Sequence, residues 1–311
     1  MQINELIEIL IKNTNLGNLI KEPVRVYGGL LNRMYKVNTI EGIYAIKHLN
    51  SEVMKRKDAK ENGIECLPAK VINNTVLQKV NNNYFLIYDW FEGKPISDTE
   101  ITFEHIEKIA RILAKIHNLD FGEIKGKCSL GRDITEVDWD FYISKLENES
   151  IKKLLIDRKD ELTILDKKAT KNAIELRNNL VVSHRDLDLP NVLWHGNNPV
   201  LIDWESAGLV NPCEEVLETA WDWSGGQEYF DIKKFEFFLE TYKKNNGDLK
   251  DFEKAIYSNF KNKSGWLEYN LKRVCKIECI DEEEQKLGEI EVVRVINEII
   301  YFYKVLKNFI I

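Results

Sequence analysis

The chain has 311 residues, of which 44% are hydrophobic and 31% are charged, and its formal net charge is −7. This balance is typical of globular proteins and excludes wholesale disorder, and the length favours two lobes over one. A duplex-binding protein usually carries a basic patch, but the basic stretch Lys55–Lys57 is offset by Asp58 and Glu61, so nucleic acid is not an expected partner.

The first ninety residues combine β-strand patterns with helical segments. Short alternating runs are separated by turns at Gly28–Gly29, Glu41–Gly42 and Asn81–Asn83, which predicts an antiparallel meander. The helical pattern at the N-terminus lacks the basic region and the cleavage site of a signal peptide. The expected strands are residues 24–27, 34–38, 44–47, 71–80 and 83–88, and the expected helices are residues 1–15 and 51–62.

After Gly93 the pattern becomes mostly helical. Apolar residues recur at helical spacing over residues 103–117, and residues 138–180 combine helical composition with many Lys and Glu residues. Short β-like runs return over residues 181–203, and helical patterns dominate from Pro212 to the end of the chain.

These patterns predict an α+β fold with two lobes. We expect a small antiparallel β-rich lobe over residues 1–91 and a larger, mostly helical lobe over residues 92–311. No uncharged run approaches the roughly 18 apolar residues of a membrane span, so a membrane is not an expected partner.

The cysteines bear on the compartment. Their number is odd and they are scattered, which fits a reducing, cytoplasmic location better than a disulfide framework. The five are Cys66, Cys128, Cys213, Cys275 and Cys279.

The segment Ser183–Asn191 and the later run Val200–Glu205 hold the densest chemistry. Together they contain His-x-Asp-x-x-x-x-Asn, then a short apolar strand, then an aspartate. In phosphoryl transfer a carboxylate orients the acceptor hydroxyl and takes its proton, and Asp186 is the candidate for that role. Asn191 and Asp203 offer the oxygen ligands that Mg²⁺ prefers.

Further candidates lie upstream. The Gly28–Gly29 turn between two strands lets backbone N–H groups approach phosphates. Lys47 ends a strand and could reach the α- and β-phosphates of a nucleotide. Lys47 then needs an anionic partner, for which we favour Glu52, while Glu61 and Glu65 stay open as alternatives.

Over nearly its whole length the chain resembles the aminoglycoside phosphotransferase and choline kinase superfamily, which is related to the protein kinases. Besides the catalytic segments, the resemblance rests on the following stretches: Gly-Gly-x-x-Asn-x-x-Tyr over residues 28–35, Ile46–Lys47, the hinge 86–93 and the helix 110–117.

The resemblance implies a bilobal kinase-like fold, with ATP or GTP between the lobes, Mg²⁺ as metal ion and a small hydroxyl-bearing substrate on the helical lobe. By matching position, Asp186 is the base and Lys47 the phosphate-binding lysine, with Asn191 and Asp203 as Mg²⁺ ligands. The turn that contributes Gly28, Gly29 and Asn32 is expected to lie at the nucleotide.

Several positions depart from the usual patterns. Arg185 and Pro190 stand where glycine is frequent in antibiotic kinases. The metal segment reads Asp-Trp-Glu at Asp203–Glu205, and Pro212 follows so soon that little room is left for a protein-kinase activation segment. These departures favour a small-molecule kinase over a protein kinase.

Other nucleotide and metal motifs are absent from the sequence. Neither G-x-x-x-x-G-K-[ST] nor G-x-G-x-x-G after a strand is present. We expect His184 and His117 to serve packing and hydrogen bonding, and a zinc site formed by His184 and His195 lacks neighbouring ligands.

The acceptor stays open between several classes. Carboxylates lining a cleft would attract a cationic aminoglycoside, and aromatic side chains could cage a quaternary ammonium, although solvated helix faces and core packing explain such residues as well. The alternatives are an antibiotic kinase, a metabolic kinase for choline, an amino alcohol, a sugar or a hydroxy amino acid, and a nucleotide-binding protein without catalysis. The residues concerned are Glu214, Glu215, Glu218, Asp222, Glu228, residues 281–284, Trp221, Trp223, Tyr229 and Trp266.

Overall fold

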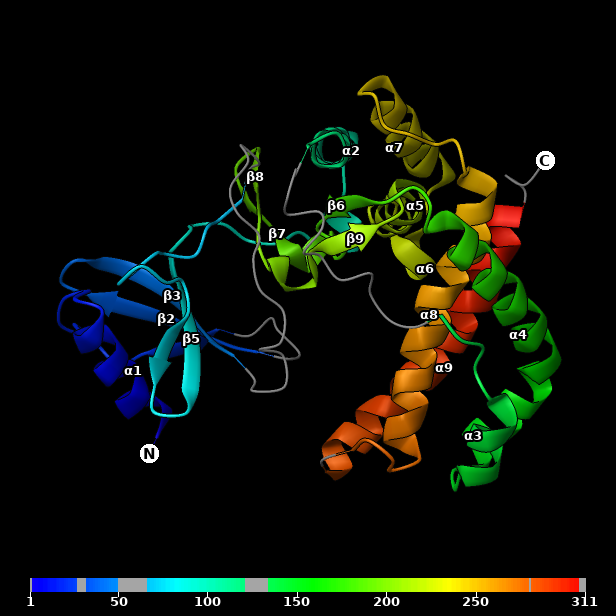
Figure 1. Cartoon of the computed structure of the whole chain (residues 1–311), viewed down its shortest axis with the longest axis horizontal. Coiled ribbons are helices and arrows are strands. Elements are labelled where there is room, and N and C mark those ends of the chain that lie inside the picture. The colour runs from blue at the N-terminus through cyan, green and yellow to red at the C-terminus, as the bar shows by residue number, and fades with distance from the viewer. Residues whose placement is uncertain (1, 27–31, 50–65, 121–133, 280, 308–311) are drawn as a thin grey trace. The chain divides into compact units, whose positions relative to one another are not determined.

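The computed structural model consists of two compact units (Figure 1). The first comprises Met1–Ser97 and Asp186–Ala207, and the second comprises Asp98–Arg185 and Gly208–Ile311. The structure describes residues 2–26, 32–49, 66–120, 134–279 and 281–307.

A five-stranded antiparallel sheet forms the body of the first unit, with the strand order β1-β2-β3-β5-β4. Its side chains alternate between the two faces; in β2, for example, Tyr35 and Val37 are buried while Lys36 between them is not. The strands are β1 Val24–Val26, β2 Arg33–Thr39, β3 Gly42–Leu49, β4 Gln78–Val80 and β5 Asn83–Asp89.

The helix α1, Ile3–Asn13, packs on this sheet (Figure 1). Leu6, Ile7, Leu10 and Ile11 recur at helical spacing, so one face of the helix is apolar and buries against the strands. This packing fixes the sheet that carries the central strand β3.

A second element of the first unit is the hairpin formed by β7, Val192–His195, and β8, Asn198–Leu201. Although it is far along the chain, it is tied to the N-terminal segment by backbone pairing of Trp194 with Lys94 and of Leu201 with Cys66. The residues between the two predicted catalytic segments therefore belong to the same unit as the sheet.

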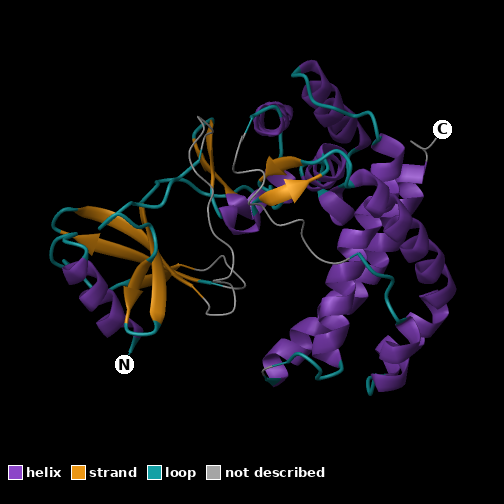
Figure 2. Cartoon of the chain, viewed as in Figure 1, coloured by secondary structure: helices purple, strands orange, loops and turns teal. Residues whose placement is uncertain are grey.

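The second unit is mostly helical (Figure 2). Its small two-stranded sheet pairs β6, Val181–Ser183, with β9, Gly208–Val210, at the two points where the chain leaves and re-enters the unit. The helices are α2 Phe103–His117, α3 Trp139–Lys145, α4 Glu149–Leu176, α5 Pro212–Asp222, α6 Gly226–Tyr229, α7 Ile232–Lys244, α8 Phe252–Val274 and α9 Glu282–Leu306. Short 3-10 turns lie at η2 Asp98–Glu100, η4 Leu189–Asn191 and η5 Trp204–Ser206.

The predicted fold class is confirmed, since an antiparallel sheet precedes a larger helical part. The helix predicted over residues 103–117 has those limits as α2, because Thr102 caps its first turn and its apolar positions are buried. The helix expected over residues 51–62 lies outside the described residues.

One strand is shorter than predicted. Of residues 71–80, only Gln78–Val80 form a strand, because Asn73 and Asn74 adopt left-handed backbone conformations and close a turn between Ile72 and Thr75. Asparagine tolerates that conformation better than most residues do.

Among the described helices, none is long and apolar enough to cross a bilayer.

Candidate active site

Lys47 lies near the end of β3, where it pairs with Met34 of β2 and Leu86 of β5. It is only 5% exposed, and lysine is almost never so buried without a partner. Its Nζ lies 2.8 Å from Oδ1 of Asp203, which is 156 positions away in the sequence. The structure therefore brings together two of the residues predicted from the sequence to bind nucleotide and metal.

Asp203 follows β8 and directly precedes the 3-10 turn η5. Its backbone is left-handed, with φ 63° and ψ 57°, a conformation that aspartate adopts more readily than most residues. The neighbouring Ile202 N–H donates to the carbonyl of Asn191 at 3.0 Å. The backbones around the two predicted Mg²⁺ ligands are thus joined directly.

The segment from Asp186 to Asn191 forms a closed loop that ends in η4. The side-chain amide of Asn191 donates to the carbonyl of Asp186 at 2.9 Å, and the Asn191 N–H donates to the carbonyl of Asp188 at 3.2 Å. With its nitrogen engaged, Asn191 presents Oδ1 as its acceptor atom. Asp186 is exposed and so accessible to a substrate.

Asp188 lies in the same loop, although its place in the sequence did not indicate a site residue. Burial of its carboxyl, and then the negative charge of Asp186, raise the pKa of Asp188 to about 7, and Asp203 adds to the effect. Its Oδ1 is buried and has no hydrogen-bond partner among the described residues. The spacing from Asp186 was visible in the sequence, but the burial was not.

This concentration of carboxylates fits a divalent cation. The negative charges of Asp186 and Asp203 both act on Asp188, and Lys47 contributes one positive charge at Asp203. Within the part of the chain that the structure describes, no group of three His, Cys, Asp or Glu side chains has the arrangement of a metal site. Mg²⁺ commonly takes one or two protein ligands and completes its shell with phosphate and water, so Asn191 and Asp203 suffice as candidates.

The peptide that precedes the Asp186–Asn191 loop is held within the second unit. Arg185, which follows the buried His184, adopts a left-handed backbone with φ 66°. For an arginine this is a strained conformation that needs support from its surroundings. The support comes from Glu215 of α5, whose Oε1 accepts the Arg185 N–H at 2.6 Å. Glycine would adopt this backbone without strain.

The other predicted nucleotide contacts are only partly described. Asn32 is buried directly before β2. Gly28, Gly29 and Glu52 lie outside the described residues, as do the alternatives Glu61 and Glu65.

Several candidate substrate contacts prove to be structural. Glu215 is only 4% exposed, so it does not lie on a solvated helix face, and Trp221 and Trp223 are fully buried core residues. Trp266 donates its indole N–H to Glu291 of α9 at 2.9 Å. Asp281 caps the first turn of α9 by accepting the Glu284 N–H.

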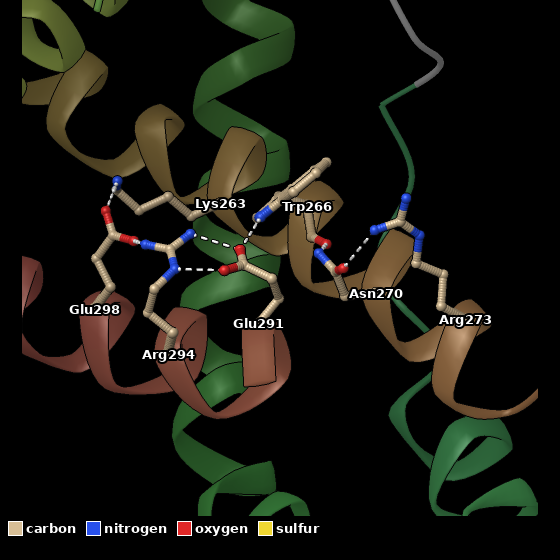
Figure 3. A network of polar contacts seen from close by, with 7 residues as sticks. All are labelled: Lys263, Trp266, Asn270, Arg273, Glu291, Arg294 and Glu298. Atoms are coloured by element: carbon tan, nitrogen blue, oxygen red, sulfur yellow. Dashed lines mark hydrogen bonds and ion pairs between the residues drawn. The ribbon is translucent and has the colours of Figure 1, made fainter. Parts of the chain in front are cut away.

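Glu291 is part of a polar network that joins α8 to α9 (Figure 3). Arg294 binds both Glu291 and Glu298, and Glu298 binds Lys263 of α8 at 2.5 Å. Asn270 and Arg273 extend the network along α8.

The chain is similar to known proteins in sequence and in fold. The model of the phosphotransferase enzyme family matches residues 26–251. No curated protein sequence matches the chain.

Solved structures match over almost the whole chain. A crystal structure of spectinomycin phosphotransferase, APH(9)-Ia, with ADP and spectinomycin is 14% identical and superposes with a TM-score of 0.70, covering 97% of each chain. An ethanolamine kinase of Plasmodium vivax is 13% identical, with a TM-score of 0.58, and the match covers 92% of this chain and 86% of that one. A choline kinase of Cryptosporidium parvum is also 13% identical, with a TM-score of 0.52 and coverage of 92% and 90%.

These structures share the fold, and the family model spans well over half of the sequence. The protein belongs to the phosphotransferase enzyme family.

Proposed function

We propose that this phosphotransferase moves the γ-phosphoryl group of ATP or GTP onto a hydroxyl group of a small molecule, with Mg²⁺ as the metal ion. The observation that carries the proposal is the contact of Lys47 with Asp203, which unites a strand lysine with the predicted metal aspartate in the unit that also holds Asp186 and Asn191. Phosphoryl transfer depends mainly on positioning and on cationic groups around the phosphates, and this set supplies both.

Asp186 is the proposed base. Its carboxylate is exposed and can accept a hydrogen bond from the acceptor hydroxyl, orient the hydroxyl oxygen and take its proton during transfer. The Asn191 side chain supports this role because it holds the Asp186 carbonyl at 2.9 Å.

Lys47 is the proposed phosphate ligand. Its position between two neighbouring strands fixes the backbone, and its pairing with Asp203 fixes the ammonium group. A positive charge held in advance stabilises developing negative charge without reorganisation at the moment of reaction.

Asn191 and Asp203 are the proposed metal ligands. Mg²⁺, when bound, neutralises charge on the phosphate oxygens. The fit rests on the backbone link between the two segments and on the neighbouring carboxylates.

We consider two classes of acceptor molecule. One is an antibiotic of the kind named for the spectinomycin phosphotransferase, and the other is choline, ethanolamine, a sugar or a hydroxy amino acid. Glu218 and Asp222 of α5 are still candidates for contact with a cationic acceptor.

The scattered cysteines favour a cytoplasmic enzyme. A non-catalytic relative is disfavoured because Lys47, Asp186, Asn191 and Asp203 are all present.

The experiment is a nucleoside diphosphate release assay with Mg-ATP and Mg-GTP. The acceptors are aminoglycosides, spectinomycin, choline, ethanolamine, homoserine and simple sugars. The Asp186→Ala protein serves as the blank, and Asp157→Ala, which changes an exposed aspartate on α4, is the matched control. Turnover that needs an acceptor and is lost only in the Asp186 variant supports the proposal. If the wild-type protein binds nucleotide but phosphorylates no member of the panel, the result supports the non-catalytic alternative.

A further inference from the structure

A chain of buried hydrogen bonds leads from α7 to the peptide that precedes the catalytic loop. The Tyr242 hydroxyl lies 2.7 Å from Nδ1 of His117, and Nε2 of His117 lies 2.8 Å from Oε2 of Glu215. The other oxygen of Glu215 accepts the Arg185 N–H at 2.6 Å. Tyr242 of α7, His117 of α2 and Glu215 of α5 thus form a chain of contacts that ends at the Arg185 backbone amide. All four residues lie in the second unit.

We propose that Tyr242 and His117 are positioning residues, which hold the Arg185 peptide in its left-handed conformation by orienting the Glu215 carboxylate. This inference rests on the proposed function in one respect: the peptide leads directly into Asp186, the proposed base.

The direction of the hydrogen bonds follows from the chemistry of the groups. Burial, more than any other cause, raises the pKa of the Tyr242 hydroxyl, which therefore keeps its proton and can donate to Nδ1. Burial alone would raise the pKa of Glu215, but the interaction with His117, followed by smaller contributions from Ser183 and the Arg185 N–H, outweighs it and lowers that pKa. Glu215 is therefore an anion that accepts from both neighbours.

We assign to His117 the tautomer in which Nε2 carries the proton donated to Glu215 and Nδ1 is the acceptor atom. Tyr242 fixes that tautomer, because a proton donor at Nδ1 requires Nδ1 to be the acceptor atom of the ring. Without the hydroxyl, the alternative tautomer with the proton on Nδ1 becomes accessible, and Nε2 then has no proton to donate to Glu215.

The packing around Tyr242, His117 and Glu215 restricts the movement of their side chains. Tyr242 is fully buried, and its ring meets the His117 ring edge-on at 5.6 Å. On another side Gly247 approaches so closely that a Cβ there would lie 2.2 Å from the Tyr242 ring. Because His117 and Glu215 are buried too, water does not readily replace a deleted hydroxyl.

The test compares Tyr242→Phe with Tyr142→Phe. Tyr142 of α3 is a matched control, because it is also buried and donates its hydroxyl to a carboxylate, that of Glu268. The first readout is amide hydrogen exchange at Arg185 without any substrate, resolved to single residues. We expect Tyr242→Phe to speed exchange at Arg185 about tenfold, and Tyr142→Phe to leave it unchanged.

The second readout is a double-mutant comparison. In a His117→Gln background the ring tautomer no longer exists, so Tyr242→Phe should have no further effect on exchange at Arg185. An additive effect there, or equal exchange in the two tyrosine variants, overturns the proposal.

Kinetics separate this inference from the proposed function. With an accepted substrate, Tyr242→Phe should lower kcat while leaving the KM for nucleotide unchanged, and an unchanged kcat despite faster exchange would overturn the positioning role. If the wild-type protein transfers no phosphoryl group, the proposed function fails, and the exchange measurements alone decide whether Tyr242 and His117 hold the peptide.

Discussion

A substitution at Lys47 separates the effect on phosphoryl transfer from the effect on stability most clearly. Lys47→Met keeps the apolar stem of the side chain, which is almost fully buried on β3, and removes only the ammonium group. Asp203 then loses its partner but is 32% exposed in its side chain, so water can solvate it partly. The pair is neither fully exposed nor fully buried. We therefore expect the free energy of unfolding to fall by about 1–3 kcal/mol, between the costs of breaking an exposed and a buried ion pair.

The effect on phosphoryl transfer should be larger. Removing one preorganised charge-stabilising group typically lowers turnover by about 10²–10³-fold, so we expect kcat/KM for nucleotide to fall by about that factor. Urea unfolding measures the stability and steady-state kinetics measure the transfer, with Lys79→Met on the exposed side of β4 as the control. A Lys47→Met protein that is destabilised as expected but keeps wild-type kcat/KM would refute the assignment of Lys47 to the phosphates.

Three further predictions concern the metal site, the helical unit and its pH dependence. Asp203→Ala should remove Mg²⁺-dependent nucleotide affinity, measured by calorimetry with and without Mg²⁺; equal affinities in the variant and the wild type would contradict its role as a ligand. Glu298→Gln should lower the free energy of unfolding by about 3–5 kcal/mol, because it leaves Lys263 buried without its main counter-charge, and a double change to apolar residues should recover most of the loss. Burial raises the pKa of Glu214 to about 7 from 4.5, although a hydrogen bond from Ser258 opposes the shift. The protonated carboxyl thus favours the folded state, and stability should fall as pH rises from about 5 to about 8. Glu214→Gln, which mimics the protonated carboxyl, should flatten that fall in urea unfolding; an equally steep fall in the variant would count against this assignment.

Much of the fold was predictable because its signals are local. Alternating strands separated by glycine turns indicated the sheet, and the apolar period over residues 103–117 indicated α2. The error over residues 71–80 arose because the apolar composition outweighed Asn73 and Asn74, whose tolerance of left-handed backbone ends the strand.

The candidate site was inferred where the proposed chemistry depends on spacing along the chain. Asp186, Asn191 and Asp203 follow a recognisable pattern, and the structure places them in one unit with Lys47. The contact of Lys47 with Asp203 spans 156 positions and left no local trace in the sequence.

Burial was the information that the sequence lacked. Glu215 occupies the first turn of α5, where acidic residues are usually solvated and favoured by the helix dipole. His117, 98 positions earlier, and the Arg185 peptide both bind its carboxylate and help to make its buried position tolerable. Asp188 was missed for the same reason, because the residues next to it in the sequence do not indicate that its carboxyl is buried.

The most direct test of the central claim is detection of the phosphorylated acceptor itself. The wild-type protein and Asp186→Ala would each be incubated with Mg-ATP and an accepted small molecule, and the phosphorylated product and ADP would be quantified by mass spectrometry. The proposed mechanism predicts equal amounts of both products from the wild-type protein and less than about one percent of that turnover from Asp186→Ala, because the base acts on the acceptor hydroxyl. ADP formed without a phosphorylated acceptor, or substantial product from Asp186→Ala, would contradict it.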